Sequence, residues 1–475
     1  MVTFIISLAI LVLGYATYGA FVEKAFGADA DRPTPAVTMP DGVDFVPMHP
    51  ARIFLVQFLN IAGLGPIFGA ISGALWGPVA FLWIVFGSLF AGAVHDYFSG
   101  MLSVRHKGAS ISEVVGIYLG PVMKQVMRGF SVVLLLLVGV IFVLGPAKLL
   151  ATITPVGASL WVGAIFVYYF LATMLPIDKL IGKVYPIFGA ALLFMAVGIA
   201  VALFVGGYQI PELTIANLHP KNLPIWPLMF VTIACGAISG FHATQSPLMA
   251  RCITNEKQGR QAFYGAMVAE GVVALVWAAA SIAFFHGTDG LSGALAKGGP
   301  GAIVYTVCTA LLGGTGGILA MVGVIACPIT SGDTAFRSAR LTIADFLKKK
   351  QVSIPDRLLI AVPCFIVGAV LCKVDFTVIW RYFAWTNQTL AMFVLWSAAV
   401  HMAQRGRLHW IVSLPATFMT AVSVTYILQA PEGLQLATGI SYPAGITAAI
   451  AALCLFMVRN KRMEAGAEQG GEEAA

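Results

Sequence analysis

The most regular feature of the sequence is a succession of apolar runs, each about 20 residues long, separated by short polar segments. A run of this length crosses the hydrocarbon core of a bilayer as an α-helix, so the pattern predicts thirteen transmembrane helices. The predicted spans are 2–21, 51–74, 78–104, 121–145, 157–175, 183–207, 224–250, 258–285, 301–346, 355–372, 376–403, 409–429 and 440–458. The run at 301–346 is too long for one straight helix, and we expect a break near Pro328 or Gly332.

The basic residues test this count, because loops on the cytoplasmic side of a membrane carry an excess of Lys and Arg. Thirteen spans place 23 of the 28 basic residues on one side and leave Lys148, Lys221, Lys297, Lys373 and Arg381 on the other. A missed or added helix would reverse the side of every later loop and remove this asymmetry. We therefore expect the N-terminus outside the cell and the C-terminus in the cytoplasm.

Composition supports a protein embedded in the lipid bilayer. Hydrophobic residues make up 59% of the sequence and charged residues only 10%, whereas soluble domains have about 25% charged residues. The net charge of +7 follows from the cytoplasmic loops and does not indicate a nucleic-acid partner. The seven cysteines lie scattered in apolar stretches without a CxxC pair, which is typical of small core residues rather than of a disulfide framework or a zinc site.

The pentapeptide GAISG occurs twice, at 69–73 and 236–240, and both copies lie in apolar runs. Glycine costs a helix about 1 kcal/mol relative to alanine, and Pro66 and Pro247 weaken the same two runs further. We predict that both helices are interrupted near these positions. Interrupted backbone inside a membrane exposes N–H and C=O groups that bind carboxylates and cations. Close packing of helices through G-xxx-G is the alternative interpretation.

The predicted helices also divide the sequence into segments. After the first helix, the next ten form two groups of five that begin at 51 and at 224, and an odd number of crossings per group gives the two groups opposite orientations. This arithmetic predicts an all-α fold with a five-plus-five inverted repeat. The expected segments are an N-terminal anchor helix with a cytoplasmic loop (1–50), two repeats (51–223 and 224–408), two additional helices (409–458) and a disordered cytoplasmic tail (459–475).

Seven stretches of the sequence resemble the carbon starvation protein A family. They are DRPTPAV (31–37), DGVDFVP (41–47), IAGLGP (61–66), AGAVHDYFSG (91–100), SGFH (239–242), GDTAFRSAR (332–340) and TNQTLA (386–391). The resemblance implies a secondary transporter of the bacterial inner membrane, active in nutrient scavenging during starvation, with peptides or pyruvate as substrates. It also implies a fold similar to the amino acid–polyamine–organocation transporters. Relatives often carry a histidine pair where this sequence has Val56 and Gln57, so a coupling role for that pair does not carry over.

Ionisable residues at bilayer depth cost roughly 2.5–3.5 kcal/mol each and usually mark function. Asp96, beside His95, and Glu270 lie within predicted helices and are candidates for proton coupling or substrate contact; structural hydrogen bonds are the alternative. Thr330, Ser331 and Asp333 form a candidate cation site, and an ion pair from Asp333 to Arg337 is its alternative. The remaining candidates for substrate binding or coupling are Asn60, Gly63, Gly65, Ser239, Gly240, His242, Asn387 and Gln388.

The sequence lacks the motifs of enzymes and ATP-driven pumps. HExxH, GxSxG and the GxxxxGK[ST] phosphate loop are all missing, so we expect neither catalysis nor a cofactor beyond a coupling ion. We predict a secondary active transporter that imports short peptides or small carboxylates by alternating access, driven by H⁺ or Na⁺. The alternative function is an ion or solute channel, since cavity-lining polar residues suit both classes of protein.

Overall fold

The computed structural model describes residues 1–42, 44–174, 178–349 and 353–472, and these residues form helices and loops without β-strands. The helices that precede the second predicted repeat are α1 (Val2–Ala16), α2 (Tyr18–Phe26), α3 (Pro35–Thr38), α4 (Pro50–Ile61), α5 (Gly65–Gly73), η1 (Ala74–Trp76), α6 (Val79–Leu82), η2 (Trp83–Gly92), α7 (Ala93–Arg105), α8 (Ile111–Leu119), α9 (Pro121–Ile153), α10 (Ala158–Met174) and α11 (Asp178–Val205).

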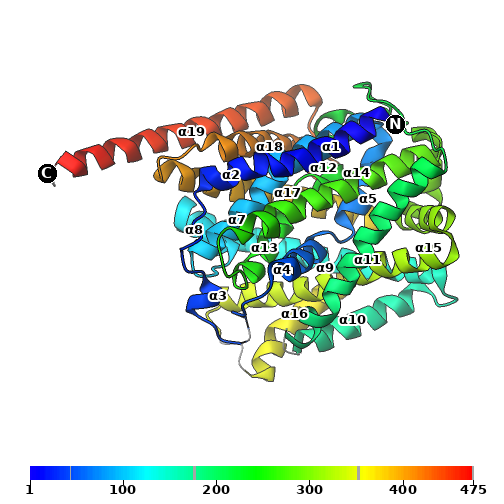
Figure 1. Cartoon of the computed structure of the whole chain (residues 1–475), viewed down its shortest axis with the longest axis horizontal. Coiled ribbons are helices and arrows are strands. Elements are labelled where there is room, and N and C mark those ends of the chain that lie inside the picture. Colours follow the sequence, from blue (N-terminus) through cyan, green and yellow to red (C-terminus); the bar gives the residue numbers. More distant parts are fainter. Residues whose placement is uncertain (43, 175–177, 350–352, 473–475) are drawn as a thin grey trace.

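The second repeat and the two added helices follow in the same bundle (Figure 1). Their elements are η3 (Ile225–Met229), α12 (Phe230–Ile233), η4 (Ala234–Gly236), α13 (Gly240–Ala250), η5 (Arg260–Gly265), α14 (Ala266–Phe284), α15 (Thr288–Phe346), α16 (Ile354–Leu371), α17 (Phe376–Gln404), α18 (Trp410–Gln429) and α19 (Thr438–Glu472). Among the elements of both groups, η1 and η4 are 3₁₀ turns, and η2, η3 and η5 are π-helical.

Each predicted span coincides with helix in the described part of the chain. Eleven of these helices are long and apolar enough to cross a membrane, or twelve with the bent pair α4–α5. Of the other two predicted spans, α10 is a shorter apolar helix and α17 carries polar residues in its middle. The segment 288–314 adds an apolar helix of its own, where the hydropathy pattern predicted a single span from 301.

The long helix α15 changes direction at Gly299 and Gly313, where φ is +68° in both residues. This backbone conformation favours glycine, which explains the choice of these two positions. The predicted break near Pro328 or Gly332 is wrong, since α15 is helical there. The Tyr169 hydroxyl contacts the Pro328 carbonyl oxygen at 3.3 Å, so α10 packs on α15 beside this proline.

The core of the bundle lies around α9 and α15, which pack along each other, while α17 contacts α9, α13 and α18. At the C-terminal end α19 packs on α18 and extends past the other helices (Figure 1). It remains helical to Glu472, where the polar composition predicted a disordered tail; its many Ala, Glu and Met residues are strong helix formers. Residue 175, the predicted end of one span, and residues 473–475 of the predicted tail lie outside the described residues.

Candidate functional site: two broken helices and a buried polar array

One helix at the start of each predicted repeat is interrupted in the middle of the bundle. Residues 62–64 separate α4 from α5, whose axes are bent by 51°, and we call them the first break. Residues 234–239 separate α12 from α13 and form the second break, in which Ala234 has a φ of +41°. Both predicted interruptions are therefore confirmed.

The two copies of GAISG adopt different conformations. The copy at 69–73 is helical within α5, whereas the copy at 236–240 covers most of the second break. The expectation that the same pentapeptide weakens both helices alike is wrong, because packing decides its conformation. A Cβ at Gly69 would lie only 2.6 Å from the carbonyl oxygen of Ile233. The first copy therefore acts as the close-packing motif that was the alternative interpretation.

Four buried side chains from three helices form a continuous series, which we call the polar array. Nδ1 of His95 lies 2.7 Å from Oδ1 of Asp96 in α7, and Nδ1 of His242 in α13 lies 2.8 Å from Oδ2 of Asp96. Nε2 of His242 lies 3.2 Å from Oε2 of Glu270 in α14. All four residues are fully buried. The structure thus brings together residues that the sequence singled out one by one.

Hydrogen-bonding chemistry limits where the protons of the polar array lie. A carboxylate only accepts hydrogen bonds, so an ionised Asp96 needs a proton on Nδ1 of both imidazoles. A neutral His242 then has a lone pair on Nε2, which suits a protonated Glu270; a doubly protonated His242 suits an ionised Glu270. One further proton would remove one buried negative charge, which is expensive to keep away from water. The array is therefore suited to the uptake and release of a proton.

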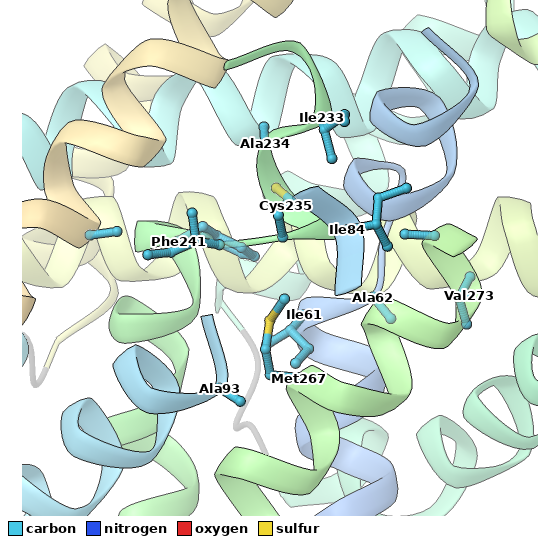
Figure 2. Close-up of a cluster of buried hydrophobic side chains, with 14 of the residues drawn as sticks. Ile61, Ala62, Ile84, Ala93, Ile233, Ala234, Cys235, Phe241, Met267 and Val273 are labelled. Carbon is cyan, nitrogen blue, oxygen red and sulfur yellow. The ribbon is translucent and has the colours of Figure 1, made fainter. Parts of the chain in front are cut away.

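Glu270 lies beside both broken helices. Its helix, α14, packs on α4 and α5 around the first break and on η4 in the second break. The Cys327 thiol donates to the carbonyl oxygens of Leu59 at 3.2 Å and of Ala62 at 3.3 Å, next to the first break. Figure 2 shows Ala62 and Cys235 within one cluster of buried side chains. Nothing in the sequence indicated that either cysteine lies at a break, although Cys327 lies one helical turn before the candidate Ser331.

The freed backbone of the second break is held by α17. Oδ1 of Asn387 accepts the N–H of Phe241 at 2.7 Å and the hydroxyl of Ser239 at 3.1 Å. Nε2 of Gln388 donates to the carbonyl oxygen of Phe230 at 2.6 Å. Asn387 therefore satisfies an N–H in the first turn of α13, which has no partner within its own helix.

The three candidate glycines lie at close contacts between helices. A Cβ at Gly240 would lie 2.4 Å from the carbonyl oxygen of Asn387. At Gly63 it would lie 2.8 Å from an aromatic ring of α9, and at Gly65 2.5 Å from a cysteine Cβ in the second break. These glycines allow the breaks to contact α9, α17 and each other.

Three amides near the polar array keep unsatisfied atoms. Asn60 Oδ1, Gln245 Oε1 and both polar side-chain atoms of Gln57 are buried and have no hydrogen-bond partner among the described residues. They lie on α4 and α13, which pack against each other. Buried polar groups are nearly always hydrogen-bonded, so these amide atoms are candidates for hydrogen bonds to a substrate.

The three residues of the candidate cation site make different contacts, and the site remains a prediction. Ser331 donates to the carbonyl oxygen of Leu59 at 3.3 Å, whereas Thr330 donates to that of Cys327 at 2.8 Å. Asp333 lies 3.8 Å from Arg337, the ion pair that was the alternative interpretation. Only Ser331 therefore faces the end of α4. Among the described residues no group of three His, Cys, Asp or Glu side chains could hold a metal ion.

Two cavities lie along α9, one near its C-terminal end and one beside its middle, and we name them outer and inner after the predicted orientation. The outer cavity, of about 260 Å³, lies beside Gly145 and is lined by residues of α5, α9, α15 and α17. The inner cavity, of about 280 Å³, lies beside Leu135 and Ser131 and also contacts Thr244 of α13. Ten residues of helix separate Gly145 from Leu135, or about 15 Å. The outer cavity contacts α5, which follows the first break, and the inner cavity contacts α13, which follows the second break.

The arrangement has the fold of known membrane transporters. A mutant of the manganese transporter of Eremococcus coleocola superposes with a TM-score of 0.55 at 12% identity, over 90% of this chain and 99% of that protein. This likeness shows the fold alone. Together with the apolar helices, it defines a multi-pass membrane protein with a five-plus-five inverted-repeat core.

The family model "Carbon starvation protein CstA" matches residues 1–159 and 143–288, and the chain belongs to this family. An uncharacterized membrane protein of Haemophilus influenzae is 46% identical over 63% of this chain and 95% of its own length. The peptide transporter CstA of Bacillus subtilis is 31% identical over 58% of this chain and 57% of its own. The pyruvate/proton symporter BtsT of Escherichia coli is 27% identical over 57% and 47%. The chain thus spans about half the length of these two named transporters.

Proposed function

We propose that this protein is a secondary active transporter of the bacterial inner membrane that imports short peptides or small carboxylates such as pyruvate during carbon starvation. The N-terminus lies outside the cell, transport proceeds by alternating access, and the driving force is the proton gradient. The polar array carries this proposal, because buried ionisable residues shared among helices are typical of proton relays. The names of the relatives, peptide transporters and a pyruvate/proton symporter, support the substrate class.

Coupling follows from a difference in proton affinity between two conformations. When the array is sealed from water, a bound proton is favoured because it removes a buried negative charge. When the opposite side opens and water reaches Glu270, the proton leaves and the carboxylate is solvated. Since His242 lies on α13 directly after the second break, this exchange biases the position of α13 against α7 and α14.

The substrate carboxylate binds between the two breaks, at the N-terminal end of a half-helix. Asn387 holds the Phe241 N–H in the conformation described here. A carboxylate oxygen is a stronger acceptor than an amide oxygen, so the substrate takes the place of Asn387 when α17 moves away from α13. The outer and inner cavities are the routes by which each side reaches this point.

Uptake by purified protein in proteoliposomes tests the function. Labelled pyruvate and labelled peptides are offered with proton and sodium gradients imposed separately. We expect saturable accumulation that follows the proton gradient. Accumulation driven by sodium alone would favour the cation site at Ser331 and contradict proton coupling, and unsaturated currents of single-channel size would indicate a channel.

The variant Glu270→Gln tests the role of the polar array. We expect it to abolish accumulation against a gradient while exchange of labelled for unlabelled substrate continues, because the amide cannot take up a proton. Asp289→Asn, at an exposed position, is the control for neutralising a carboxylate. Gradient-driven accumulation that survives in Glu270→Gln would refute the coupling role.

A further inference from the structure

Two lysines meet at the outer cavity, on the side of the molecule that the basic-residue pattern places outside. Lys148 of α9 and Lys297 of α15 both line it and are both exposed. This side carries only five of the 28 basic residues. Two ammonium groups at one cavity produce a positive potential that attracts anions and raises their local concentration.

One acidic residue, Asp375, lies among the residues that line the same cavity. Its Oδ1 accepts the backbone N–H of Thr377 at 2.8 Å and so caps the start of α17. These hydrogen bonds from Thr377 lower the pKa of Asp375, and the residue stays ionised as a helix cap. Two lysines against one carboxylate leave the cavity with a surplus positive charge.

Aromatic rings form the floor of the outer cavity. Phe68 of α5 and Phe376 of α17 line it, and their ring centres lie 6.3 Å apart. Trp380 contacts both rings, at 6.1 Å from Phe68 and 5.9 Å from Phe376. Nζ of Lys148 lies 4.8 Å from the centre of the Phe376 ring. Since Phe68 lies less than one helical turn after Gly65, this floor separates the cavity from the first break.

The backbone of α15 adds to the positive potential. The helix bends at Gly299, and the new segment begins with Pro300, Gly301 and Ala302, all of which line the cavity. The first turn of a helix carries the positive end of its dipole. A Cβ at Gly299 would meet no atom within 4 Å, so the bend borders open space into which a ligand fits.

We propose that the outer cavity is a capture site for a carboxylate anion, in which Lys148 and Lys297 hold the substrate above the aromatic floor before it passes to the broken helices. The carboxylate faces the two ammonium groups, and the apolar body of the organic acid rests on the rings of Phe68 and Phe376. The inference rests on the proposed function for the identity of the anion, and it adds a first binding step outside the central site.

The double variant Lys148→Gln/Lys297→Gln tests this site, with pyruvate as the probe. We expect the KM of uptake to rise about five- to tenfold while kcat is unchanged, since the variant loses two exposed charges that attract the anion and exposed charges have modest effects. Salt screens exposed charges, so high ionic strength should raise the wild-type KM toward that of the variant. Lys221→Gln, which removes another external lysine, is the matched control, and Lys148→Arg/Lys297→Arg should restore the wild-type KM.

Binding of labelled pyruvate to the purified protein, measured without a gradient, tests the capture site separately from the proposed transport function. Uptake with the wild-type KM in the double glutamine variant would overturn the capture site and leave the proposed function intact. Lysine-dependent binding without any gradient-driven uptake would support the capture site and contradict the proposed function. A KM that rises equally in Lys221→Gln would reduce the effect to general surface charge and overturn the capture site.

Discussion

His242 contacts a buried carboxyl group with each of its two ring nitrogens. Asp96 lies on one side of the imidazole and Glu270 on the other, so a proton added to one end of the array changes the hydrogen bonding at the other. No other residue type provides two titratable nitrogens on opposite edges of one ring. Within the polar array, the connection between Asp96 and Glu270 therefore passes through this single side chain.

His242→Gln should uncouple transport from the proton gradient. Glutamine keeps one hydrogen bond to Asp96 but cannot gain or lose a proton. We therefore expect the accumulation ratio to fall at least about fivefold, which corresponds to the lower end of typical coupling free energies. Exchange of substrate at equal concentrations should continue. Both are measured in the same proteoliposomes, and an accumulation ratio equal to wild type would show that the array is only structural.

The candidate residues could be predicted one at a time, but their contacts could not. A carboxylate or imidazole within an apolar run is conspicuous, so Asp96, His242 and Glu270 were found. That they form one array depends on the rotation and register of three helices, which the sequence does not encode locally. Lys148 and Lys297 were counted only as loop charges, because 149 positions separate them and only the bend of α15 brings them to one cavity.

At the scale of elements, glycine determines how closely the two broken helices approach. Gly69→Ala should destabilise the protein, since the added methyl carbon would lie 2.6 Å from the carbonyl oxygen of Ile233, and backbone cannot yield as a side chain does. We expect a loss of about 1–3 kcal/mol, measured as a lower Tm in detergent.

Gly163→Ala, in α10, is the matched control for this substitution. A Cβ at Gly163 meets no atom within 4 Å, so alanine should be neutral or stabilise the helix by up to about 1 kcal/mol. Equal Tm values for the two variants would contradict the close-packing role of the first GAISG copy.

The existence of both breaks could be predicted because glycine, proline and polar residues coincide there. Their extent could not, since the same five residues are helical in α5 and unwound before α13. In α15 proline was a misleading indicator: the helix continues through Pro328, and its bends lie at Gly299 and Gly313 instead. Local residue preferences thus indicated which helices are interrupted, and tertiary contacts determined at which residues each interruption or bend lies.

At the scale of the whole molecule, the alternation of loops predicted thirteen spans whose order agrees with the helices of the structure, but it did not predict the additional apolar helix at 288–314. A missed or added span reverses the predicted side of every later loop. An error in the number of spans would therefore appear in the distribution of Lys and Arg between the two sides. The inverted repeat followed from the same count. The packing of α19 on α18 and the two cavities along α9 could not follow from it, because they depend on side-chain shape.

The predicted orientation can be tested by labelling from outside the cell. In a background without the exposed Cys454, Lys221→Cys should react with a membrane-impermeant maleimide in intact cells, and Lys257→Cys should react only after the membrane is opened. Both positions are exposed, so accessibility of the side chain is matched. The reverse pattern would invert the topology.

The contact of Asn387 with the start of α13 also affects how readily protons could cross without substrate in the proposed mechanism. If α17 withdraws while the carrier is empty, the Phe241 N–H loses its acceptor inside the protein, and a stranded donor of this kind costs about 1–3 kcal/mol. A molecule that brings its own carboxylate abolishes that penalty. In the proposed mechanism, cycles in which protons flow without substrate would then be about 5- to 150-fold rarer than cycles that carry substrate.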